Sequence, residues 1–157
     1  MRHTIKMLGL VLVLALSACG AEDRDHLGRF VGTWRATSGT VTTICPGYQP
    51  FTDPVSGNLV WSSGVSSDLI STDLNGACAM MADVNGATAS GVPGQSCTGP
   101  DGIGGLSTVT FVGYTFVISA DGHTATENMS GHVTYVVEGA SIVCSFNQSA
   151  SYQKIGN

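Results

Sequence analysis

Four cysteines, Cys45, Cys78, Cys97 and Cys144, are the residues of this 157-residue chain with the most readily anticipated chemistry. Their thiols can ligate a metal or pair as disulfides, and a metal site usually brings two ligands within about four residues of each other. No two of these cysteines lie that close, and no pair of histidines accompanies them. We therefore predict two disulfides and no metal site, an arrangement typical of an oxidising compartment.

The pairing of the four cysteines stays open from spacing alone, because four cysteines allow three connectivities. We favour Cys45–Cys144, with Cys78–Cys97 nested inside it. The first bond would join the first strand to the last, and the second would brace a central hairpin. Closed loops of about 100 and about 20 residues predict several kcal/mol of stabilisation on the chain-entropy description.

Catalytic signatures are missing from the sequence. There is no Gly-x-Ser-x-Gly, no His-Glu-x-x-His and no glycine-rich phosphate or dinucleotide loop. His132 is the best candidate for a general base, with Glu127 or Glu138 as a partner, whereas a solvated imidazole is the ordinary reading of His123. The acidic residues lack the spacing of a calcium loop. We predict no catalytic residue, no cofactor and no enzymatic activity.

The first 18 residues have the three parts of a secretory signal. Arg2 and Lys6 form a positive n-region, Met7–Ala18 is apolar, and small residues come just before the expected cleavage point. The apolar run is much shorter than the roughly 20 residues that a membrane-spanning helix needs. We therefore predict that residues 1–18 direct export.

A cysteine closes this signal, within Leu16-Ser17-Ala18-Cys19. The stretch resembles the lipobox of bacterial lipoproteins; the alternative is an ordinary cleaved signal with an unrelated cysteine. The resemblance implies a diacylglyceryl group on Cys19, cleavage after Ala18 and an acylated new amino terminus, with palmitate as the expected type of chain. Gly20 stands where Asp commonly retains lipoproteins in the inner membrane, so the resemblance favours the outer membrane. Residues 19–28 are polar and predict a flexible tether.

The chain beyond the signal is acidic and carries few charges. Its basic residues are Arg24, Arg29, Arg35 and Lys154. Against 11 acidic residues these give a formal charge of −7. A nucleic-acid partner is therefore excluded, because its electrostatic footprint would be basic. Residues 29–157 suffice for one domain with a single core.

Short runs rich in Val, Thr, Ile, Tyr and Phe dominate this domain, and no helical period is sustained. Asn85-Gly86 and Asp121-Gly122 are strong signals for two-residue hairpins. The predicted strands lie near residues 30–45, 58–63, 67–73, 77–84, 87–92, 106–120, 123–138 and 140–153. Because consecutive strands are joined by hairpins, we predict an all-β fold with a single antiparallel meander.

The register of the strand near 106–120 indicates how the sheet curves. Val109 and Phe111 have one parity, whereas the large side chains of Tyr114–Ile118 have the other. A bulge at Gly113 would return both sets to one face, and we expect Gly131 to act in the same way in the next strand. Strands that bend at glycines allow a sheet to close, so we favour a barrel over a sandwich.

The longest irregular stretch covers residues 93–105, which are rich in Gly and Pro around Cys97. The pattern predicts a loop at one mouth of the barrel, with neither strand nor helix. It would serve either as a surface excursion pinned by a disulfide or as a recognition loop.

Phe30-Val31-Gly32-Thr33-Trp34 opens the first predicted strand. It resembles the Gly-x-Trp start of the lipocalins and fatty-acid-binding proteins, together called calycins. In that superfamily an eight- or ten-stranded meander closes into a barrel, the Trp plugs one end, and a basic residue from the last strand packs across it. The resemblance implies that Gly32, Trp34 and Lys154 close the barrel, with a cation–π contact worth about 0.5–2 kcal/mol. The family's middle motif, Thr-Asp-Tyr, is missing at residues 71–74.

Two hypotheses for the function follow. As in calycins, the barrel would bind a small apolar or amphipathic ligand, with Trp61, Tyr114, Phe116 and Tyr135 as wall residues. The alternative is a structural or protein-interaction role for a solidly packed barrel that acts through its loops and outer face. In both, the expected lipid anchor at Cys19 would make the membrane a partner and place the protein on the bacterial outer membrane, at its periplasmic face or at the cell surface.

Overall fold

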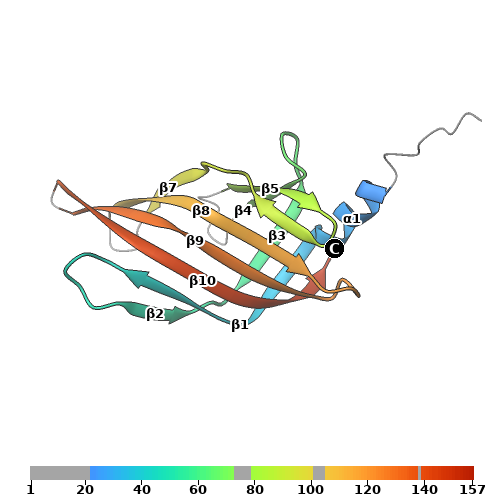
Figure 1. The fold of residues 1–157 in the computed structure, drawn as a ribbon, viewed down its shortest axis with the longest axis horizontal. Coiled ribbons are helices and arrows are strands. Elements are labelled where there is room, and N and C mark those ends of the chain that lie inside the picture. The colour runs from blue at the N-terminus through green and yellow to red at the C-terminus, as the bar shows by residue number, and fades with distance from the viewer. Residues whose placement is uncertain (1–21, 73–78, 101–104, 138) are drawn as a thin grey trace, which may run out of the picture.

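The computed structural model describes residues 22–72, 79–100, 105–137 and 139–157 (Figure 1). One helix, α1 (Glu22–Phe30), comes first, and strands follow it. They are β1 (Gly32–Ile44), β2 (Phe51–Pro54), β3 (Asn58–Ser63), β4 (Leu69–Thr72), β5 (Ala79–Asn85), β6 (Thr88–Gly91), β7 (Ser96–Pro100), β8 (Leu106–Ile118), β9 (Thr124–Val137) and β10 (Ala140–Gly156).

Eight of these strands form a closed antiparallel barrel. Their order around the barrel is β1, β3, β4, β5, β6, β8, β9 and β10, and β10 pairs back onto β1 from Thr33 to Ile44. Each of the eight predicted strands corresponds to one of them. The predicted fold class, an antiparallel meander barrel of eight strands, is confirmed.

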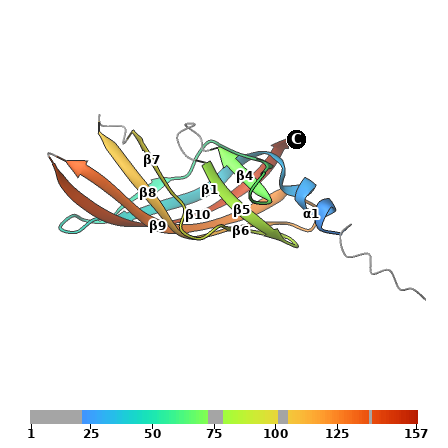
Figure 2. The same ribbon diagram turned by 90° about the horizontal axis from the view of Figure 1, so that it is seen from above.

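The barrel has a closed half and an open half because its strands differ in length. β1 and β8 have 13 residues each, whereas β3 has six and β6 has four. The long strands therefore continue past their short neighbours, away from α1 (Figures 1 and 2). We call the part next to α1 the closed half, or closed end, and the opposite part the open half.

Two short strands occur that the sequence analysis does not predict. β2 pairs with the second half of β1, and β7 pairs with the first half of β8. These are the segments of the long strands that extend past β3 and β6, so their edges would otherwise lack a partner. The loop predicted over residues 93–105 is therefore corrected: it contains β7, while residues 101–104 lie outside the described part of the chain.

The prediction of a flexible tether over residues 19–28 is wrong for the part that the structure describes. Residues 22–28 belong to α1, and residues 19–21 lie outside the described residues. The helix is held at the closed end, where Phe30 is fully buried and Leu27 packs against the core. Arg29 Nη2 donates hydrogen bonds to the carbonyl oxygens of Ser119 and Ala120, at 2.8 and 2.9 Å. Contacts with the barrel therefore stabilise a helix that its polar sequence does not predict.

Trp34 and Lys154 lie together at the closed end. Trp34 is fully buried, its Nε1 donates to the Phe30 carbonyl oxygen at 2.8 Å, and its ring meets Phe116 edge-on at 5.2 Å. Lys154 Nζ lies 5.7 Å from the centre of the Trp34 ring and donates to the Arg29 carbonyl oxygen at 3.1 Å. The contact predicted between these two side chains is present.

Gly32 supplies the space that this closure needs. Its φ of +129° disfavours other residues, and a Cβ there would overlap the carbonyl oxygen of Gly156. The first residues of β1 and the last residues of β10 therefore approach closely beside Lys154.

The predicted bulge in β8 is confirmed. The pairing of β8 with β9 shifts register between Phe111 and Gly113, which leaves Val112 as an extra, exposed residue. Val109 and Phe111 thus face the interior together with Tyr114 and the inward residues beyond it.

The expectation of a second bulge at Gly131 is wrong. β9 pairs with β10 in continuous register from Val137 to Thr124. A Cβ on Gly131 would instead overlap the carbonyl oxygen of Thr110 in β8 and lie 2.8 Å from the Phe146 ring. Gly131 therefore makes room for the β8 backbone on one side and for an aromatic side chain of β10 on the other.

The disulfide Cys45–Cys144 is confirmed and spans 99 residues of sequence. It links the end of β1 to β10 in the open half, next to the last pair of the β1–β10 ladder, Ile44 with Ser145. Cys97 is also disulfide-bonded. Its predicted partner, Cys78, lies outside the described residues.

Candidate binding cavity in the open half

A cavity of about 370 Å³ occupies the barrel interior in the open half. Its apolar wall is built from inward side chains of the long strands: Val41, Val109, Phe111, Val133, Tyr135 and Phe146. Most of this wall is only half-buried, so apolar surface faces the empty space. The volume falls within the range of about 300–1,000 Å³ that small-molecule sites occupy.

The closed half beneath the cavity is packed solid with aromatic rings. Trp61 meets Tyr114 and Phe116 at ring-centre distances of 6.0 and 6.1 Å, and Phe116 meets Tyr152 at 5.6 Å. Trp61 and Phe116 have no exposed surface, either to solvent or to the cavity.

Of the four predicted wall residues, only Tyr135 lines the cavity. Trp61, Tyr114 and Phe116 pack below it, which corrects their predicted position. The physical reason is size, because the largest apolar side chains fill the closed half completely. The cavity remains in the open half, where the long strands extend past β3 and β6.

The floor of the cavity contains a buried carboxyl group that sequence analysis considered only as a partner for His132. Glu127 is 2% exposed and lines the cavity. Its Oε2 accepts hydrogen bonds from Tyr152 Oη at 2.8 Å and from Gln148 Nε2 at 2.6 Å. The alternation of β9 could have revealed its position, since Glu127 has the parity of the buried Ala125 and Val133.

Two tyrosines beside this carboxyl group are kept protonated. Burial, followed by the charge of Glu127, raises the pKa of Tyr114 well above its usual value. The same causes in the same order raise the pKa of Tyr152. Both hydroxyls are therefore neutral hydrogen-bond donors at physiological pH.

The interior also contains two unpaired polar atoms. Tyr114 Oη and Trp61 Nε1 are buried and find no hydrogen-bond partner of good geometry within the described chain. Such groups ordinarily cost about 1–3 kcal/mol each. Two polar atoms without a partner among the described residues therefore lie in the otherwise apolar aromatic core.

His132 and Glu127 do not form a catalytic pair. His132 is exposed on the outer face of β9, opposite Thr110 and Ser145, whereas Glu127 points inward. Glu138, the other predicted partner, lies outside the described residues. In the described ranges, no group of three or more His, Cys, Asp or Glu side chains could hold a metal ion.

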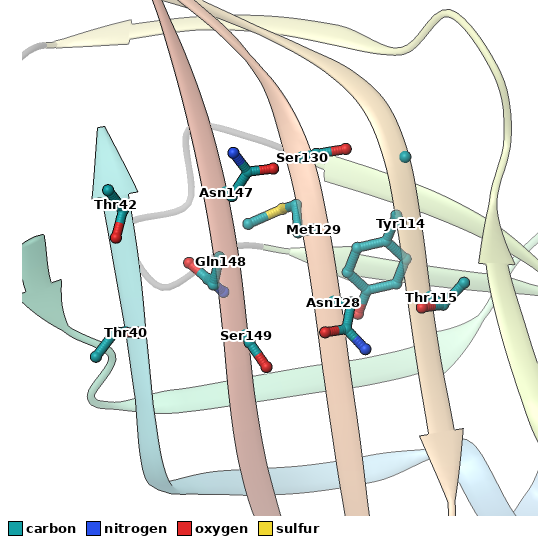
Figure 3. Close-up of a pocket in the computed structure, with 11 residues that line it drawn as sticks. Thr40, Thr42, Tyr114, Thr115, Asn128, Met129, Ser130, Asn147, Gln148 and Ser149 are labelled. Atoms are coloured by element: carbon teal, nitrogen blue, oxygen red, sulfur yellow. The ribbon is translucent and has the colours of Figure 1, made fainter. Parts of the chain in front are cut away.

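A second hollow, of about 540 Å³, lies on the outer face of β1, β10, β9 and β8 (Figure 3). Its outward side chains form two rungs across the strands. They are Thr42, Asn147 and Ser130 in one rung and Thr40, Ser149 and Asn128 in the other. These small polar groups are largely exposed and well solvated. Because it has no enclosed apolar wall, this hollow is a weaker candidate than the interior cavity.

Comparison with protein-family models, with curated proteins and with solved structures finds no match to the chain. Across the described residues, no helix combines the length and apolar character needed to cross a membrane.

Proposed function

We propose that this protein is a lipid-anchored binding module of the bacterial envelope. Its barrel holds a small apolar or amphipathic molecule in the open half, and Cys19 attaches it to the outer membrane. The observation that carries the binding role is the interior cavity with its half-buried valine, phenylalanine and tyrosine wall. The anchor rests on the resemblance of residues 16–19 to a lipobox.

The division of the barrel into two halves supports binding. A solid aromatic core below the cavity stabilises the fold without the need to fill the open half. The wall above it stays accessible because β3 and β6 end early and leave the long strands to extend beyond them. A preformed apolar cavity of this kind binds ligands with little conformational cost.

The binding role is tested with N-phenyl-1-naphthylamine, a neutral apolar dye that fluoresces strongly in apolar surroundings. We expect saturable binding of one dye per barrel. Val41→Trp fills the cavity from β1 and should weaken dye binding by about tenfold or more, since it removes space and apolar contact area. Thr40→Trp is the matched control, because Thr40 is the preceding residue of β1 and lines the outer hollow.

Thr40→Trp should leave dye binding unchanged. If it weakened binding while Val41→Trp did not, the outer hollow would be the site. If the wild-type protein bound no dye, the packed structural or interaction role would replace the binding role. Near-ultraviolet circular dichroism checks that both variants fold.

The anchor is tested by Cys19→Ser, which removes the sulfur that would carry the lipid. We expect the wild-type protein in the outer-membrane fraction and the variant in the soluble fraction, because two or more acyl chains hold a protein on a bilayer and their loss releases it. Gly20→Asp is the control: it keeps the lipid and should move the protein to the inner membrane. Retention of Cys19→Ser on membranes would contradict the anchor.

A further inference from the structure

We propose that the cavity selects a ligand with an apolar body and a cationic, ammonium-type head, and that Glu127 receives this head. This inference rests on the proposed binding function and names the chemical class of its ligand. It follows from the hydrogen bonds of the Glu127 carboxylate, from the positions of the basic residues and from the residues that line the cavity.

The hydrogen bonds of Glu127 leave one oxygen available. Tyr152 Oη and Gln148 Nε2 both donate to Oε2, at 2.8 and 2.6 Å. Among the described residues, the hydrogen bonds of good geometry to this carboxylate reach only Oε2, and the unpaired Tyr114 hydroxyl lies nearby as a further neutral donor. The carboxylate is thus fixed in place by two neutral donors, with capacity for another donor.

No positive charge of the described chain balances this carboxylate. The described basic and imidazole side chains are His26, Arg29, Arg35, His123, His132 and Lys154. None of them forms an ion pair with Glu127: Arg29 and Lys154 make their contacts at the closed end, and Arg35 and His132 are exposed. A buried charge normally has a partner of opposite sign, because its desolvation is costly. We infer that the ligand brings the missing charge.

The rest of the cavity suits an apolar body attached to that head. Above the floor, the lining changes from Glu127, Gln148 and Tyr152 to an apolar wall that includes Val109 and Phe111. Tyr152, which donates to Glu127, also lines the cavity. An anionic head would instead be repelled by the carboxylate at short range.

The experiment measures how three amphiphiles of equal chain length displace the naphthylamine dye from the wild-type protein at neutral pH. They are octylamine, which is cationic, octanol, which is neutral, and octanoate, which is anionic. We expect octylamine to bind about tenfold tighter than octanol, and octanoate to bind most weakly, because the charges act inside a poorly solvated cavity.

Two variants test whether Glu127 causes the preference for octylamine over octanol. Glu127→Gln keeps the shape and one acceptor oxygen for Tyr152 and Gln148 but removes the charge, so octylamine and octanol should bind within about twofold of each other. Asp83→Asn removes the same charge from an exposed position on β5, outside the cavity, and should keep the wild-type preference.

The outcomes separate this inference from the proposed function. If the dye and octanol bind but octylamine has no advantage in the wild-type protein, the ammonium-type ligand is excluded and the binding function stands. If Glu127→Gln folds, binds octanol and still prefers octylamine, Glu127 does not bind the cationic head. If neither the dye nor any amphiphile binds, the binding function itself fails. The wild-type series decides the charge preference even if Glu127→Gln does not fold.

Discussion

Removal of the Cys45–Cys144 disulfide by the double substitution Cys45→Ala and Cys144→Ala should lower the free energy of unfolding by about 2–5 kcal/mol. The bond closes 99 residues of sequence, so it removes much of the freedom of the unfolded chain. It also fixes the far end of the β1–β10 ladder, the pairing that closes the barrel. Because a small domain has about 5–15 kcal/mol of stability in total, the loss would be large.

Urea unfolding under non-reducing conditions measures this effect. The dependence of the unfolding free energy on urea should become steeper in the variant, since its unfolded chain is less compact. The double variant Cys78→Ala and Cys97→Ala serves as the comparison. Its predicted loop of about 20 residues is shorter, so the loss should be smaller by roughly 1 kcal/mol. Equal losses, or a loss below about 1 kcal/mol for Cys45 and Cys144, would contradict the loop-closure explanation.

The barrel strands could be predicted because local signals mark their ends. Asn85-Gly86 and Asp121-Gly122 correctly mark the β5–β6 and β8–β9 connections, where Gly86 and Gly122 have φ values of 60° and 73°. The first turn is formed by Gly86 and Ala87, because Asn85 pairs with Thr88. The expectation of a two-residue hairpin at Asp121-Gly122 is wrong, since that connection covers residues 119–123. The parity change in β8 placed the bulge at Gly113. These turns and the bulge depend only on a few neighbouring residues, so they can be predicted from the local sequence.

The elements that were missed form for tertiary reasons. β2 and β7 have four and five residues and contain Pro54 and Pro100, so no local pattern marks them as strands. They pair because β1 and β8 extend past β3 and β6. In the same way, α1 is polar and is held in place through Arg29 and Phe30 on the barrel end. Each case needs the fold to exist before the element is stable.

The binding cavity was only partly predictable. Aromatic residues were expected on its wall, but Trp61 and Phe116 fill the closed half, and the wall combines valines with Phe111, Tyr135 and Phe146. Glu127 could have been assigned to the interior from the alternation of β9, as could Tyr135. The sequence contains no signal for how far the aromatic core extends, because that depends on side chains from all eight strands.

Trp34→Ala should destabilise the barrel by about 3–5 kcal/mol, the usual range for deleting a buried aromatic side chain. Trp34 is fully buried, packs edge-on against Phe116, donates to the Phe30 carbonyl oxygen and lies under Lys154. Its loss would leave a void at the closed end and unpair that carbonyl oxygen. Thermal and urea unfolding measure the change.

Lys154→Ala is the matched control for the Trp34 variant. It removes the cation–π contact and the hydrogen bond to Arg29 but leaves the ring, so the expected loss is about 0.5–2 kcal/mol. The double variant should lose less than the sum of the two changes, because the two side chains contact each other. Since both lie at the closed end and neither lines the cavity, the affinity of each folded variant for the naphthylamine dye should stay unchanged. A weakened affinity in folded Lys154→Ala protein would mean that the closed end takes part in binding, contrary to a purely architectural role.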